Sequence, residues 1–120
     1  MDNDKIEELA YKIKDLLDKY NMDGDTVIYF NNKRLQCFTT NKKYKTNKKD
    51  KWILEKGYKA SDYCKYANDD LITMTFEGLL SMHNVINGFE KKGNFMKKFE
   101  NLLDNYNCYF ELGNTWNLKL

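Results

Sequence analysis

The chain is expected to fold as a single α+β domain, with an antiparallel sheet of about five to six strands packed against two to three helices. Three observations predict this class. Some long segments repeat apolar residues every three or four positions, as amphipathic helices do, whereas short segments alternate apolar and polar residues, as half-buried strands do. The two kinds of segment occur in separate groups along the chain, as in α+β domains. No linker divides residues 1–120, so one domain is expected.

The first helix is expected from Asp4 onward and is expected to end at residues 21–24. Asp4, followed three residues later by Glu7, resembles a capping box, which places an acceptor and a carboxylate at the positive helix end. One apolar stripe at helical spacing then predicts a face that packs in the core. Its members are Ile6, Leu9, Ile13, Leu16, Leu17 and Tyr20.

A β-hairpin is expected next, with strands at 26–30 and 34–38 around a turn at 31–33. Any even-length loop places Ile28, Phe30, Leu35 and Cys37 on one face, so Cys37 is expected to be buried. Five further elements follow from the same periodicities. They are a strand at 52–54, a helical turn at 61–67 capped by Ser61, a half-buried strand at 71–76, and helices at 79–86 and 94–106.

The last element is expected to be a second hairpin, with strands at 108–112 and 115–120. A two-residue turn at Gly113–Asn114 would mix polar and apolar residues on both faces. A three-residue loop at 112–114 instead places Glu111 opposite Thr115 and separates the two kinds of residue. In that register the inward residues are Cys108, Phe110, Trp116, Leu118 and Leu120.

Composition narrows the functional classes. No run of 18 apolar residues exists, and the acidic N-terminal segment does not resemble a secretory leader, so a cytoplasmic protein without membrane association is expected. The three cysteines match no metal or redox spacing and are expected to be reduced thiols. No cofactor or metal site is expected, and the sequence does not indicate an oligomeric state.

A lysine-rich segment at 41–51 is the first candidate for a binding site. It holds six lysines and one acid in eleven residues, although the net charge of the whole chain is only +2. Such a segment can face an acidic protein surface or the phosphates of a nucleic acid, with nearby aromatic rings stacking on bases. It can equally be a solvated loop. The candidate residues are Lys42, Lys43, Tyr44, Lys45, Lys48, Lys49, Lys51 and Trp52.

Clustered tyrosines are the second candidate. Tyr58, Tyr63 and Tyr66 fall within nine residues of one another in a chain with nine tyrosines, and tyrosine is enriched among the energetic anchors of protein interfaces. On a helical turn, Tyr63 and Tyr66 would share one face. The alternative is that the three rings only cover the sheet.

Signs of catalysis are few. His83 is the only histidine, and general acid–base chemistry needs a second positioned group. A dyad of His83 with Cys64 would require the two to meet in space, which the sequence does not indicate. We therefore expect a protein without enzymatic activity.

Two stretches carry a resemblance: ASDYCKYANDDLITMTFEGLL at 60–80 and CYFELGNTWNLKL at 108–120. They resemble small proteins carried by low-GC bacteria, their phages and mobile elements. In size and general character the chain is similar to anti-CRISPR and other anti-defence inhibitors, and also to immunity proteins that neutralise toxins. The resemblance implies an inhibitor that blocks its target by covering a surface. The implied target is a bacterial defence nuclease, which can be a ribonucleoprotein, or a similar protein. The alternative is a small nucleic-acid-binding accessory protein that uses the lysine-rich segment.

Overall fold

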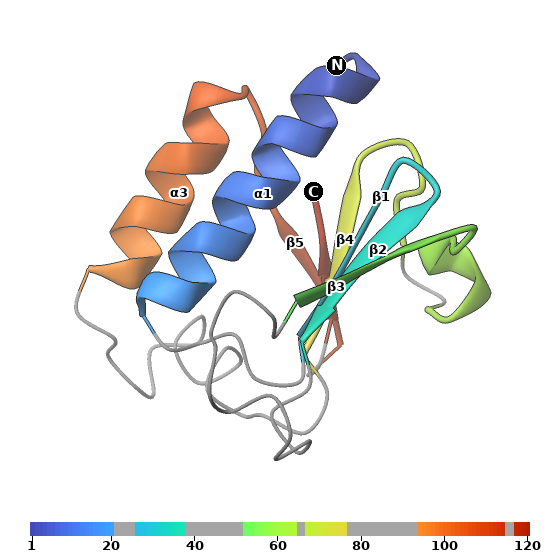
Figure 1. Ribbon diagram of the computed structural model, residues 1–120. Helices are drawn as coiled ribbons and strands as arrows, with labels where there is room; N and C mark the ends of the chain where they lie inside the picture. The colour runs from blue at the N-terminus through green and yellow to red at the C-terminus, as the bar shows by residue number, and fades with distance from the viewer. Residues whose placement is uncertain (21–25, 38–51, 65–66, 77–93, 115–116) are drawn as a thin grey trace.

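The computed structural model describes residues 1–20, 26–37, 52–64, 67–76, 94–114 and 117–120. In this part of the chain two helices and six strands form an α+β fold, which confirms the expected class (Figure 1). The helices are α1 (Asn3–Lys19) and α3 (Phe95–Asn105), and a short 3₁₀ turn, η3, spans Ala60–Asp62. The strands are β1 (Thr26–Phe30), β2 (Lys33–Cys37), β3 (Trp52–Lys56), β4 (Ile72–Thr75), β5 (Glu111–Asn114) and β6 (Asn117–Lys119).

All six strands belong to one antiparallel sheet with the order β3-β2-β1-β4-β6-β5. β3 lies at one edge, whereas β4 lies on the far side of β1, so the connection between them must pass β2 and β1. That connection includes η3, and it runs over one face of the sheet (Figure 1). We call this face the crossover face.

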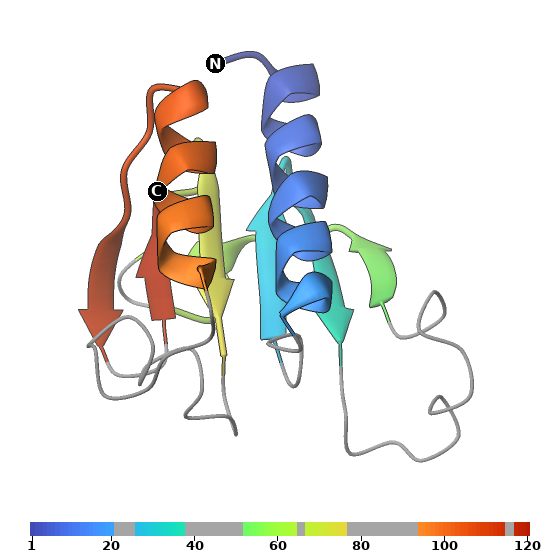
Figure 2. The same cartoon turned by 90° about the vertical axis from the view of Figure 1, so that its left-hand side faces the viewer.

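The opposite face, which we call the helix face, is covered by α1 and α3, which lie side by side (Figures 1 and 2). Here the apolar stripe of α1 packs against every second residue of the strands. The helical repeat and the strand alternation of the sequence therefore contribute to the same hydrophobic core. Phe99 of α3 is fully buried and stacks on Phe95, with ring centroids 5.6 Å apart. Other fully buried members of this core are Leu9, Ile13, Leu17, Ile28, Ile72, Met74, Phe76, Leu103 and Leu118.

α1 begins earlier than the sequence suggested. Asp2 is the N-cap, and its carboxylate accepts a hydrogen bond of 2.8 Å from the backbone N–H of Lys5. Asp4 lies in the first turn, where its charge still favours the helix N-terminus. The apolar stripe is as predicted: Ile6, Leu9, Ile13 and Leu17 are buried.

The first hairpin has a two-residue turn at Asn31 and Asn32, whose φ angles of 48° and 64° are both left-handed. Asparagine tolerates this conformation, and two successive positive φ angles are typical of a type I′ turn. β2 therefore begins at Lys33, one residue before the expected start. Ile28, Phe30, Leu35 and Cys37 are all buried, which confirms the predicted face and the burial of Cys37.

Two central elements differ from expectation. β4 is buried on both faces, Thr73 and Thr75 included, because the helices cover Ile72 and Met74 and the end of the connection lies over the other face, where the N–H of Asn68 donates to Oγ1 of Thr73. The expected half-buried strand is thus wrong. The turn near Ser61 starts at Ala60, and Ser61 does not cap it. Instead the N–H and the hydroxyl of Ser61 both donate to the carboxylate of Asp69.

The register predicted for the second hairpin is wrong. Glu111 pairs with Lys119 and Leu112 with Leu118, and an irregularity between Leu112 and Asn114 shifts the ladder before Asn114 pairs with Asn117. Asn114 is thus part of β5 and does not hold the loop position expected for it. The predicted division of the faces is confirmed for Leu118, which is buried, and for Phe110, which packs against Phe99 at 5.5 Å.

The expected strand at 52–54 extends to Lys56, and the expected helix at 94–106 is α3. The expected helix at 79–86 lies outside the described residues. In the described segments, neither helix has the length and apolar character needed to cross a bilayer.

Candidate functional site

Most of the lysine-rich candidate lies outside the described residues. This applies to Lys42, Lys43, Tyr44, Lys45, Lys48, Lys49 and Lys51, and also to Tyr66 and His83. The predicted binding roles stay predictions, and the dyad of His83 with Cys64, which the sequence does not indicate, is not covered by the described residues.

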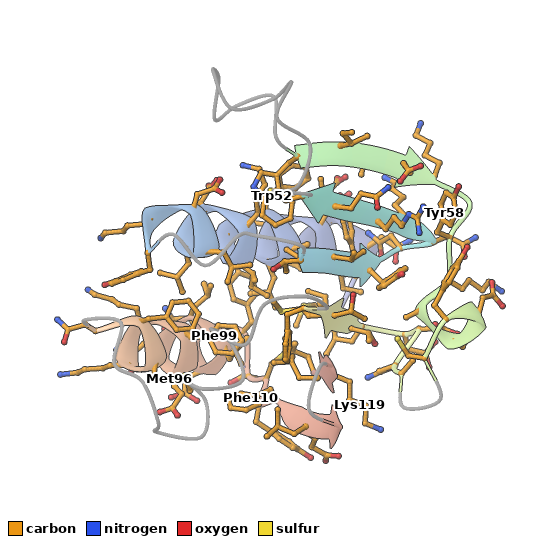
Figure 3. All side chains as sticks on the ribbon, turned by 90° about the horizontal axis from the view of Figure 1, so that it is seen from below. Trp52, Tyr58, Met96, Phe99, Phe110 and Lys119 are labelled. Carbon is orange, nitrogen blue, oxygen red and sulfur yellow. The ribbon has the colours of Figure 1, made fainter. Side chains whose placement is uncertain are left out.

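Trp52 is described, and it is a core residue. Its ring is buried on the helix face, and its indole N–H donates a hydrogen bond of 2.8 Å to Oδ1 of Asp18 on α1. Figure 3 shows Trp52 and Tyr58 at opposite ends of β3. In this position Trp52 links β3 to α1, and its ring offers no open face to a base, so we leave it out of the candidate site.

The predicted tyrosines Tyr58 and Tyr63 come together on the crossover face with two residues that the sequence analysis did not select. Tyr29 of β1 and Arg34 of β2 are direct cross-strand partners. Tyr58 and Tyr63 reach them from the connection between β3 and β4. We call Tyr29, Arg34, Tyr58 and Tyr63 the tyrosine–arginine cluster.

Arg34 lies at the centre of this cluster. Its guanidinium carbon is 3.7 Å from the centroid of the Tyr58 ring and 5.6 Å from that of Tyr63. Tyr63 also stacks on Tyr29, with centroids 5.8 Å apart and ring planes 22° apart. A planar cation over a ring face is attracted by the ring quadrupole, and arginine makes this contact more often than lysine. The cation therefore holds both tyrosines in place.

Glu55 compensates the positive charge of Arg34, which is partly buried in the cluster. Nε of Arg34 donates to Oε1 of Glu55 at 3.0 Å, across the β2–β3 pair. Burial on its own would lower the pKa of Arg34, but Glu55 and the hydrogen bond with Tyr29 outweigh it and raise that pKa. Burial raises the pKa of the Tyr29 hydroxyl, although the hydrogen bond and the charge of Arg34 oppose the shift. At neutral pH the cluster thus contains a cationic Arg34 beside the protonated hydroxyl of Tyr29.

The backbone before Tyr58 fixes where its ring lies. Gly57 adopts a φ of 82°, and the N–H groups of Gly57 and Tyr58 both donate to the carbonyl of Asn32, at 2.8 and 3.1 Å. The chain leaves β3 through this contact with the β1–β2 turn. Ala60 then packs against Val27 and Tyr29 of β1, which anchors η3 on the sheet. Tyr63 follows directly as the C-cap of η3, and its N–H donates to the carbonyl of Ala60.

A cavity of about 230 Å³ adjoins the cluster, between the β1–β2 turn and the connection. Several of its polar groups are engaged within the protein. The amide of Asn68 donates to the carbonyl of Leu120 at 2.8 Å, and the carboxylate of Asp69 accepts from Ser61. Among the described residues no group of three or more His, Cys, Asp or Glu side chains could hold a metal ion. The cavity therefore has no group that we assign to a ligand.

Exposure distinguishes the members of the cluster. Tyr29 is buried, Arg34 and Tyr58 are partly buried, and Tyr63 is 52% exposed. Tyr63 thus presents an open ring supported from below by Tyr29 and Arg34. One sequence signal for Arg34 existed: it is the single arginine among 20 basic residues. Selecting Arg34 from the sequence would have required the register of the first hairpin, which pairs it with Tyr29.

Comparisons with protein-family models, with curated proteins and with solved structures found no match to this chain.

Proposed function

We propose that this chain is a non-enzymatic binding protein that contacts a protein partner through the tyrosine–arginine cluster. The observation that carries the proposal is the open ring of Tyr63, held by stacking on Tyr29 and by the guanidinium of Arg34. Tyrosine and arginine are the residue types enriched at the energetic centres of protein interfaces.

The geometry of the cluster favours binding for an entropic reason. Immobilising a flexible side chain on binding costs about 0.5–1.5 kcal/mol, whereas a ring already fixed by its neighbours avoids most of that cost. Tyr63 and Tyr58 are fixed against each other at 6.1 Å and against Arg34. Tyr63 is therefore a preorganised anchor.

The resemblance of residues 60–80 and 108–120 to small proteins of phages and mobile elements gives the proposal its direction. We propose that the chain is an anti-CRISPR-like inhibitor that acts in the bacterial cytoplasm. Such an inhibitor would cover a surface of a defence nuclease or a toxin without changing it chemically. Tyr63 belongs both to the first of these stretches and to the cluster.

A pull-down from a low-GC bacterial lysate tests the proposal. The wild-type chain, Tyr63→Ala and Tyr109→Ala are used as bait, each with and without nuclease treatment, and recovered proteins are identified by mass spectrometry. Tyr109 is the matched control because it is 71% exposed, lies away from the cluster in sequence, and is also a tyrosine. We expect one stoichiometric protein that survives nuclease, is lost with Tyr63→Ala and is retained with Tyr109→Ala.

Two results would contradict the proposal. Equal recovery by all three baits would remove the cluster from the interface. Recovery that collapses on nuclease treatment would instead support the nucleic-acid-binding alternative, in which lysines 42–51 neutralise phosphates and affinity falls steeply with salt.

A further inference from the structure

The edge strand β3 carries two exposed apolar side chains at its centre. Ile53 is 43% exposed on the crossover face, and Leu54 is 40% exposed on the helix face. A regular, apolar edge strand is a template for pairing with another strand, and proteins usually blunt such edges. β3 runs for five residues in unbroken register with β2.

The hydrogen-bond phase of the sheet shows which backbone groups of β3 face outward. In a hairpin with a two-residue turn, Phe30 and Lys33 form the closing hydrogen-bonded pair, so Arg34 and Gln36 direct their N–H and C=O groups toward β3. Their partners there are Glu55 and Ile53. The bond from the N–H of Gly57 to the carbonyl of Asn32 continues the same phase.

Alternation along β3 then places the N–H and C=O groups of Trp52, Leu54 and Lys56 on the outer side. No described strand pairs with that side, because β3 ends the strand order. The outer side of β3 therefore offers up to three hydrogen-bonding residues, with Leu54 in the middle.

The other edge of the sheet is built differently. β5 has four residues, and its ladder with β6 is interrupted between Leu112 and Asn114. Bulges of this kind twist an edge away from regular pairing. Leu112 of β5 is 38% exposed, close to the value for Leu54. The two edges thus match in leucine exposure and differ in regularity.

We propose that two copies of this chain pair through β3, antiparallel about a two-fold axis at Leu54, so that the two sheets become continuous. Leu54 would face Leu54 of the second copy, and because both its N–H and C=O point outward, the two residues would exchange two hydrogen bonds. Both leucine side chains would be removed from water.

Among the symmetric registers, this one has the best complementarity. It uses all five residues of β3 and places Ile53 opposite Glu55, and Trp52 opposite Lys56, so that no like charges face each other. A two-fold axis at Glu55 would bring two carboxylates together, which is destabilising. An axis at Ile53 would pair only three residues of the strand. Self-complementarity of the strand thus favours a second copy over an unrelated partner.

The pairing is independent of the proposed function. The exposed anchor Tyr63 lies in the connection after β3, and neither Leu54 nor Ile53 belongs to the tyrosine–arginine cluster. Loss of pairing and loss of partner binding are therefore expected from different variants.

Light scattering coupled to size exclusion, over concentrations from low micromolar to near millimolar, tests the pairing. For the wild type we expect the mass to rise with concentration from that of one 14.4 kDa chain toward two. Such a small interface belongs to the weak end of specific interfaces, so a rise within this range is appropriate. Leu54→Lys and Leu54→Glu are each expected to keep the mass of one chain throughout, because like charges would face each other at the axis.

An equimolar mixture of Leu54→Lys and Leu54→Glu is expected to recover the mass of two chains, since opposite charges then face each other. A misfolded variant would not show this recovery. Leu112→Lys is the matched control on the bulged edge, and it is expected to behave as the wild type.

A wild type that keeps the mass of one chain at every concentration would overturn the proposal and leave the edge to a strand from another protein. Association of Leu54→Lys equal to that of the wild type, or its loss in Leu112→Lys, would remove β3 from the contact. Failure of the mixture to associate would overturn the two-fold axis at Leu54.

Discussion

The two faces of the sheet are made by the same strands, yet they differ in what they contribute. β1 gives Ile28 and Phe30 to the helix face, which is a continuous apolar core, and Tyr29 to the crossover face, which holds a small aromatic and ionic cluster. The first face buries many apolar side chains at once, whereas the second fixes a few polar ones. The difference shows that successive residues of one strand can serve different purposes: those on the helix face stabilise the fold, and those on the crossover face support the candidate binding site. Mutations on the two faces should therefore differ in kind.

The largest loss of stability is expected on the helix face. Phe99→Ala removes a fully buried ring that contacts Phe95 and Phe110, and leaves a cavity between α3 and the sheet. Such truncations cost about 3–5 kcal/mol. Urea denaturation followed by circular dichroism measures the change in the free energy of unfolding. A cost below that of Tyr63→Ala would contradict the division between the faces.

A smaller loss is expected for Trp52→Phe. The variant keeps an apolar ring but deletes the indole N–H that bonds to Asp18, and a partly buried carboxylate that loses a donor costs about 1–3 kcal/mol. The same denaturation experiment measures it, and Trp52→Tyr is a second variant without the indole donor. Trp52→Phe should also cost less in an Asp18→Ala background than in the wild type, and an equal cost in both backgrounds would show that Trp52 acts only through its apolar area.

On the crossover face, Arg34→Lys is expected to cost about 0.5–1 kcal/mol, because an ammonium group keeps the charge but loses the planar stack on Tyr58. Lys33→Arg, at the neighbouring position in β2, is a control that changes the same two residue types. A cost for Arg34→Lys as large as that for Phe99→Ala would show that the cluster is part of the core.

Tyr63→Ala is expected to change the free energy of unfolding by only about 0.5 kcal/mol, since half of its ring is already in water and lost stacking is its main cost. Its effect on recovery of the proposed partner should be far larger. Thermal melts of Tyr63→Ala and Tyr109→Ala, recorded side by side, give the comparison. A strongly destabilised Tyr63→Ala would assign the ring a structural role.

The smallest effect at neutral pH is expected for the titration of Tyr29. Burial raises the pKa of its hydroxyl in the folded state, so the unfolded chain releases this proton first as pH rises. The resulting loss of stability begins near the ordinary tyrosine pKa of about 10 and continues up to the raised pKa. Urea denaturation at pH 9 to 11 should show a shallower decline for Tyr29→Phe than for the wild type. Parallel declines would contradict the shift.

Local patterns in the sequence predicted the fold class, α1, the first hairpin and α3. In each case the pattern and the packing agree: the stripe of α1 is the buried stripe, and Cys37 lies on the face that alternation assigned to it. The register of the second hairpin was not predictable in this way. Its ladder contains an irregularity, and a single extra residue inverts the inferred pairing.

The candidate site was predicted only in part. Tyr58 and Tyr63 were selected because they are close in sequence. Their partners Tyr29 and Arg34 are more than 20 residues earlier in the chain, and they contact the two tyrosines only because the connection from β3 crosses the sheet. Trp52 was misread because it follows a lysine-rich segment, whereas its environment is set by α1. Strand order is a property of the whole chain, and local patterns do not encode it.

The burial of the three thiols differs, so that a thiol-reactive reagent can label one cysteine selectively. Cys37 and Cys64 are buried, whereas Cys108, just after α3, is only partly buried. Burial raises the pKa of the Cys108 thiol, so less of it is thiolate at neutral pH, and maleimide or iodoacetamide reagents should react faster in mildly alkaline buffer. A single dye or spin label could thus be attached to the native chain without engineering. In a symmetric pair the two labels would then report one intermolecular distance.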